Sequence, residues 1–159
     1  MKWITSLAFI ALFGGCESKD RLLTIEPSMK NVSGHYELSY VGFNSTIDSE
    51  IKSKIPKSNI ELKDDGTMVL TNFPVVTQND THVFSVQRYH TGSTSYKISP
   101  LGATSGSTFY GIYVNHGDLP DPLHAPCFRS EGESLTLSFE YFDGDFVPRM
   151  EFTRTEPDQ

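Results

Sequence analysis

Two short segments of alternating apolar and polar residues, joined by a three-residue turn, constrain the fold of this chain more than any other feature. Residues 60–63 and 67–70 flank the turn Asp64-Asp65-Gly66, which is typical of a hairpin loop with glycine in the left-handed conformation. The facing pairs in the register that this turn sets are Lys63 with Thr67, Leu62 with Met68, and Ile60 with Leu70. The large apolar side chains of the hairpin then share one face, as in a half-buried antiparallel sheet.

A second hairpin near the C-terminus follows the same pattern. Leu135, Leu137 and Phe139 alternate along one strand, and Met150 and Phe152 alternate along the other. A two-residue turn at Gly144-Asp145, with glycine first as a type II′ turn requires, connects them. The predicted facing pairs are Phe139 with Met150, Leu137 with Phe152 and, on the outer face, Glu140 with Arg149.

Further alternating segments predict strands through the rest of the chain. Residues 35–41 place Tyr36, Leu38 and Tyr40 on one face. Weaker patterns occupy residues 83–86, 95–98 and 108–114. About eight antiparallel strands predict an all-β protein, an up-and-down barrel that closes on itself and leaves no free sheet edge. A two-sheet β-sandwich is the alternative architecture.

One segment has helical periodicity instead. Ile47, Ile51 and Ile55 recur every four residues, Ser45 precedes them as a candidate N-cap, and Pro56 follows them. We therefore expect one short helix that lies across an end of the barrel and covers its core.

The N-terminus is typical of a secretion signal. Lys2 precedes an apolar run over residues 4–13, which has the length of a signal-peptide core and is too short to span a membrane. The run leads into the sequence LFGGC at residues 12–16, which resembles the lipobox of bacterial lipoproteins. The resemblance implies removal of residues 1–15, thioether lipidation of Cys16 and acylation of its new amino group.

Lipidation of Cys16 implies an anchored protein, because two or more acyl chains, at about 0.8 kcal/mol per buried methylene, hold a protein stably on a bilayer. Glu17 follows the cysteine, whereas lipoproteins retained at the inner membrane usually have Asp there. The resemblance thus implies the outer membrane of a bacterial cell envelope. The alternative is an ordinary secretory signal and a disulfide between Cys16 and Cys127.

Length and charge limit what the remainder of the chain does. The 159 residues divide into a signal over 1–15, the lipidated cysteine and a tether over 16–27, and a single β domain over 28–156. Twenty acidic and 13 basic side chains give a net charge of −7. Nucleic-acid binding requires a basic patch, so we expect no nucleic-acid partner.

The domain also resembles small lipocalin-like bacterial lipoproteins, through the opening Gly34-His35-Tyr36 and the two hairpins. Tyr36 occupies the position at which lipocalins proper have a tryptophan. In lipocalins an arginine packs on that tryptophan, and either Arg149 or Arg154 would correspond to this arginine. The resemblance implies a barrel that binds a small ligand. An apolar cavity of this kind would be lined by the tyrosines of the middle strands, which are Tyr89, Tyr96, Tyr110 and Tyr113.

No residue pattern points to catalysis or to a cofactor. The five histidines lack zinc-site spacing, and the nucleophile-elbow, Walker and dinucleotide-binding motifs do not occur. The connection before Cys127 holds His116, Asp118, Asp121 and His124, for which a metal site and a proline-stiffened loop are the alternatives. A Cys127 nucleophile would need thiolate character. We expect no enzyme activity, no metal and no cofactor.

Two functions follow from these features. In the first, the anchored barrel binds a small apolar ligand, which predicts a cavity. In the second, it is a protein-interaction or immunity lipoprotein that blocks a basic toxin or phage component in the periplasm, which predicts a solid core and an acidic surface.

Overall fold

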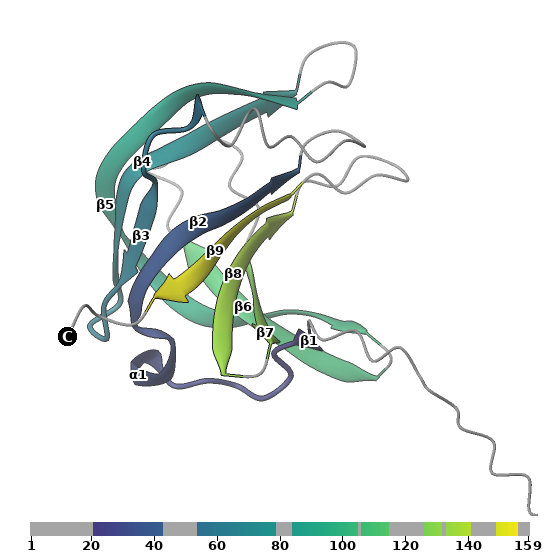
Figure 1. The fold of residues 1–159 in the computed structure, drawn as a ribbon. Coiled ribbons are helices and arrows are strands. Elements are labelled where there is room, and N and C mark those ends of the chain that lie inside the picture. Colours follow the sequence, from purple (N-terminus) through teal and green to yellow (C-terminus); the bar gives the residue numbers. More distant parts are fainter. Residues whose placement is uncertain are drawn as a thin grey trace, which may run out of the picture.

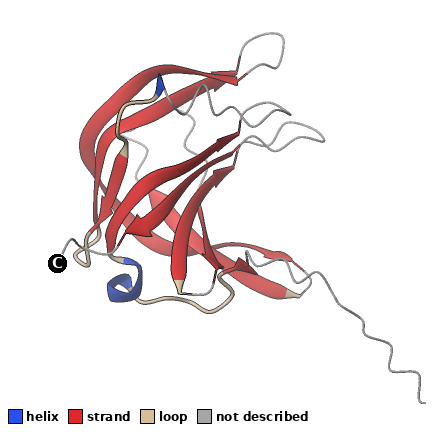
Figure 2. Ribbon diagram, in the orientation of Figure 1, coloured by secondary structure: helices blue, strands red, loops and turns tan. Residues whose placement is uncertain are grey.

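In a computed structural model the chain forms an antiparallel β-barrel (Figure 1). The structure describes residues 21–42, 54–78, 84–104, 106–114, 126–131, 133–140 and 149–155. Nearly all of these residues lie in strands (Figure 2), and the described helix α1 (Met29–Val32) is a single turn. The all-β prediction is confirmed.

Eight strands, β2 to β9, close the barrel in the order of the sequence, and a short ninth strand, β1, pairs with β7. The strands are β1 (Arg21–Leu22), β2 (Gly34–Gly42), β3 (Asn59–Leu62), β4 (Thr67–Gln78), β5 (Phe84–Thr104), β6 (Ser107–Val114), β7 (Cys127–Glu131), β8 (Ser134–Glu140) and β9 (Arg149–Thr155). Each strand from β2 onward pairs antiparallel with the next, and β9 pairs with β2. The architecture is the predicted up-and-down barrel and not the two-sheet sandwich.

Both predicted hairpins have the predicted register. Leu62 faces Met68 and Ile60 faces Leu70, while the Lys63 amide donates to the Thr67 carbonyl at 2.9 Å. Gly66 has a φ of +84°, as the turn requires. In the second hairpin the facing pairs are Phe139 with Met150, Leu137 with Phe152, and Glu140 with Arg149. The predicted Gly144-Asp145 turn lies outside the described residues.

The prediction that Tyr40 shares the inner face of β2 with Tyr36 and Leu38 is wrong. The pairing with β9 shifts between Leu38 and Tyr40, so Ser39 is an extra residue and the alternation changes phase. Val41 replaces Tyr40 in the core. The Tyr40 ring instead lies on the outer face, 5.1 Å from the Arg149 guanidinium carbon.

The two weak strands predicted around residues 83–86 and 95–98 belong to one strand, β5, which is 21 residues long. Its first half pairs with β4 and its second half with β6. The sequence does not show that the two segments are continuous, because residues 91–95 between them are all small or polar. Such a run has no alternation of apolar and polar side chains from which a strand can be predicted.

Most of the segment predicted to form a helix lies outside the described residues. Of its described residues, Lys54 is helical and Ile55 packs partly buried against the core. The helix α1 was not predicted; it begins after Ser28, whose side chain accepts a bond from the Asn31 amide as an N-cap. The buried Tyr36 hydroxyl donates to the Val32 carbonyl at 2.5 Å and fastens α1 to the barrel.

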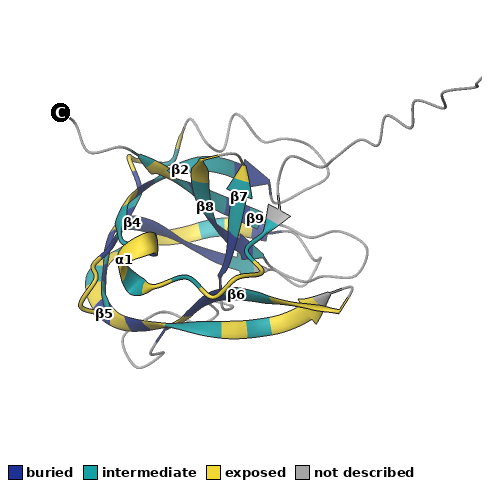
Figure 3. Ribbon diagram, turned by 90° about the horizontal axis from the view of Figure 1, so that it is seen from below, coloured by how far each residue is buried: buried dark blue, intermediate teal, exposed yellow. Residues whose placement is uncertain are grey.

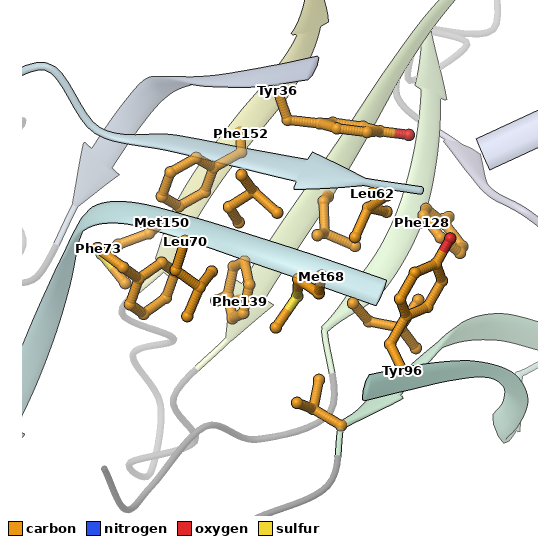
Figure 4. Packing of buried hydrophobic residues seen from close by; sticks show 14 of the residues in the cluster. Tyr36, Leu62, Met68, Leu70, Phe73, Tyr96, Phe128, Phe139, Met150 and Phe152 are labelled. Atoms are coloured by element: carbon orange, nitrogen blue, oxygen red, sulfur yellow. The ribbon is translucent and has the colours of Figure 1, made fainter. Parts of the chain in front are cut away.

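Aromatic side chains from strands on different sides of the barrel meet in its interior (Figure 4). Phe73 of β4 lies 5.1 Å from Phe139 of β8 and 5.5 Å from Phe152 of β9, measured between ring centroids. Because two other strands separate β4 from β9 along the wall, these contacts cross the barrel. At this level the interior is filled by side chains.

The wall is weakest between β6 and β7, which share the single register pair Gly111 with Cys127. Beyond this pair β1 lies between the two strands. Leu22 faces Arg129 of β7, and Leu23 donates to the Phe128 carbonyl and accepts from the Tyr110 amide of β6, both at 3.0 Å. Residues 21–23 therefore complete the barrel wall.

The two ends of the barrel differ in their connections. At the end with α1, tight turns join β3 to β4, β5 to β6, and β7 to β8; Figure 3 views the barrel from this side. At the opposite end lie the last residues of β2, β4, β6 and β8, from which the longer connections start.

Candidate functional site

The four tyrosines predicted to line a cavity do not come together. Tyr96 is buried and its hydroxyl donates to the Lys63 carbonyl at 2.8 Å; burial raises its pKa to about 12, with a further contribution from the nearby Asp65 and Asp64 carboxylates. Tyr89 and Tyr113 are 41% and 48% exposed. Tyr110 is half-buried where β6 meets Leu23.

A pocket of about 280 Å³ lies elsewhere, at the α1 end of the barrel. We call it the end pocket. The N-terminal segment forms one side, and α1, the turn between β7 and β8, and the end of β9 form the others. Its lining residues are Leu23, Ile25, Glu26, Pro27, Asn31, Val32, Ser130, Glu133, Ser134, Leu135 and Arg154.

Arg154 is the basic group of the end pocket. It faces Tyr36 across β2 and β9, and its guanidinium Nη1 donates to the Asn31 carbonyl at 3.0 Å. Gly34, with a φ of +146°, makes room for it, because a Cβ at this position would lie 2.8 Å from the Arg154 Nε. Of the two arginines left open by the sequence, Arg154 is thus the one beside Tyr36, while Arg149 lies over Tyr40 on the outer face.

The composition of the end pocket suits a small, mainly apolar molecule. Leu23 and Leu135 provide apolar surface that joins the core, and Arg154 provides hydrogen-bond donors that match a carboxylate. The volume is near the lower limit of typical ligand pockets, about 300–1,000 Å³. Sequence reasoning missed this site because its residues come from four separate segments; the one local signal was a glycine before Tyr36 on the strand facing Arg154.

Cys127 belongs to a polar cluster on the outer face of β7 and β8. Its thiol lies 3.8 Å from a Glu140 carboxylate oxygen, which also accepts a bond from the Ser138 hydroxyl at 3.4 Å. Burial and the Glu140 charge raise the thiol pKa to about 11, although Arg129 opposes the shift. Cys127 is a free, buried thiol and is protonated at neutral pH, unlike an activated nucleophile.

The register pair predicted for Glu140 is confirmed, but its ion pair is with a residue of another strand. Glu140 and Arg149 are a register pair, but Glu140 forms its ion pair with Arg129 of β7, and both side chains are 18% exposed. Arg149 pairs with Glu151 at 3.2 Å. Closure of β7 onto β8 brings the half-buried Arg129 within reach of Glu140, and the hairpin of β8 and β9 considered alone does not contain β7.

Several sequence predictions fall on residues outside the described part of the chain. These are Cys16 and the signal before it, and the loop histidines and aspartates His116, Asp118, Asp121 and His124. Among the described residues no group of three or more His, Cys, Asp or Glu side chains is placed to hold a metal ion. Within the same residues no helix has the length and apolarity needed to cross a membrane.

Comparison with models of protein families, with curated proteins and with solved structures gives no match. The function is therefore inferred from the residues and geometry of this chain.

Proposed function

We propose that this protein is a lipid-anchored β-barrel lipoprotein of the bacterial outer membrane that binds a small apolar ligand with an anionic end. The observation that carries the ligand is the end pocket, in which apolar side chains and one arginine surround about 280 Å³. Phe73, Phe139 and Phe152 fill the centre of the barrel. We therefore place the ligand in the end pocket and not in a central cavity.

The ligand has its apolar part against Leu23 and Leu135, and its acceptor group at Arg154. The other charged groups of the end pocket, Glu26 and Glu133, are carboxylates, which repel an anion placed near them. They therefore favour a ligand whose single charge lies at the Arg154 side.

Calorimetric titration tests the ligand proposal on the Cys16→Ser protein. Octanoate and octylamine carry the same chain and opposite charges, so binding of octanoate but not octylamine is expected. Arg154→Gln should weaken octanoate about tenfold, because a hydrogen bond to a charged group contributes about 1.5–3 kcal/mol. Arg149→Gln, on the same strand but on the outer face, is the matched control and should leave binding unchanged. No binding of octanoate at millimolar concentration would exclude the ligand proposal.

The anchor is tested separately at Cys16. The unaltered chain should label with radioactive palmitate and fractionate with membranes, and Cys16→Ser should do neither. A Cys16→Ser chain that still labels with palmitate and stays in the membrane fraction would refute the proposed lipid anchor at Cys16.

The protein-interaction function is the second candidate, and one observation favours it. The connections 43–58, 79–83, 115–126 and 141–148 all start from the end of the barrel away from α1. Their acidic residues are Asp48, Glu50, Asp80, Asp118, Asp121, Asp143 and Asp145, and their basic residues are Lys52, Lys54 and Lys57, so 3 − 7 = −4 of the net charge of −7 belongs to these segments. Such charge attracts a basic protein. This function becomes the better account if octanoate does not bind.

A further inference from the structure

The N-terminal segment that completes the barrel wall also presents an apolar side chain to solvent. Leu23 packs against the core, whereas Ile25, two residues later, is 81% exposed. Both line the end pocket. An exposed isoleucine alone requires no explanation, but this one is on the segment that joins the barrel to Cys16.

The length of the tether limits how the barrel faces a membrane. Four residues separate Cys16 from Arg21, so this link spans at most about 18 Å. β2 has nine residues and is about 30 Å long, and at a tilt of about 40° it rises about 23 Å. Because residues 21–23 of the predicted tether form part of the wall, only residues 17–20 link the wall to Cys16. They are too short to run its height, so the end that holds β1 and α1 remains near the anchor.

We propose that the α1 end of the barrel rests on the lipid bilayer and that the Ile25 side chain inserts into it. This inference rests on the proposed lipidation of Cys16. The end pocket then adjoins the membrane, and its ligand is an amphiphile that enters from the lipid phase. One isoleucine does not hold the protein on the bilayer without the anchor, so docking and lipidation act together.

Tryptophan fluorescence tests this orientation in the full lipidated chain. Trp3 is the single tryptophan of the sequence and lies in the predicted signal, so Trp3→Phe removes any contribution from it. In this background Ile25→Trp reports on the docked end. Tyr113→Trp is the matched control, because Tyr113 is also exposed, at 48%, but lies on β6 one residue from the opposite end of that strand.

Both variants are reconstituted in vesicles of phosphatidylethanolamine and phosphatidylglycerol, with and without lipid brominated near the headgroup. A side chain about 5–10 Å into the interface is quenched, so we expect Ile25→Trp to be blue-shifted and quenched several-fold more than Tyr113→Trp. Equal quenching of the two variants would overturn the docking inference.

Palmitate labelling of the same samples separates this failure from a failure of the anchor. A labelled chain with equal quenching retains its anchor and lacks the docked orientation. An unlabelled chain refutes the lipidation and, with it, the inference that depends on it.

Discussion

The hydrogen bond between Tyr36 and α1 gives the sharpest test of how the barrel end is held. Tyr36→Phe removes one oxygen atom, keeps the ring in the core, and takes away the donor that reaches the Val32 carbonyl at 2.5 Å. Tyr36 and Val32 are both fully buried, so water does not readily replace the lost bond. Leaving a buried acceptor without this partner costs about 1–3 kcal/mol.

Urea unfolding measures this cost. With a loss of about 2 kcal/mol and a slope of about 2 kcal/mol per molar urea, typical of small proteins, the midpoint should fall by about 1 M. Tyr89→Phe removes the same atom from a side chain that is 41% exposed and should change the free energy of unfolding by less than about 0.5 kcal/mol.

Tyr36→Phe should also change how the stability depends on pH in the alkaline range. Burial raises the pKa of Tyr36 well above its ordinary value, although the nearby Arg154 opposes the shift. The unfolded chain ionises this tyrosine near pH 10, so the stability that it contributes is complete below that pH and is lost as the pH rises further. Tyr36→Phe should therefore lose stability less steeply than the unaltered protein between pH 10 and 12. If it matches Tyr89→Phe in midpoint and matches the unaltered protein in pH dependence, the proposed fastening of α1 is refuted.

Three further predictions concern the core, the seam and the thiol. Phe152→Ala should cost about 3–5 kcal/mol in urea unfolding, because it empties a fully buried position in contact with two other rings; a cost below about 1 kcal/mol would indicate a loosely filled interior. Gly111→Ala should weaken the seam between β6 and β7, since the new Cβ would lie 2.1 Å from the Pro126 carbonyl oxygen; hydrogen exchange of β6 and β7 amides should accelerate, and unchanged protection would contradict this. In the Cys16→Ser protein, Cys127 should resist iodoacetamide at pH 8 until the chain is unfolded, because its pKa is raised to about 11; rapid labelling of the folded protein would show that the thiol is not protonated and shielded.

The sequence alone determined the local pairing of this protein. Alternation and turn residues predicted the hairpin from Ile60 to Leu70 and the pairing of Leu137 and Phe139 with Phe152 and Met150, and both have the predicted register. Side chains in a hairpin meet partners that are near in sequence, and a glycine turn sets which residues face each other. Enough such hairpins also predicted the closed barrel.

Tertiary structure decided the contacts that depend on distant strands. A bulge at Ser39 turned Tyr40 outward, closure of β7 onto β8 gave Glu140 the partner Arg129, and the end of β9 placed Arg154 beside Tyr36. The end pocket likewise exists only where the N-terminal segment, α1 and the turn between β7 and β8 meet. An alternating pattern states which face a side chain occupies; it does not state which strands lie across the barrel from that face, and those distant neighbours decide whether the space is filled or left open.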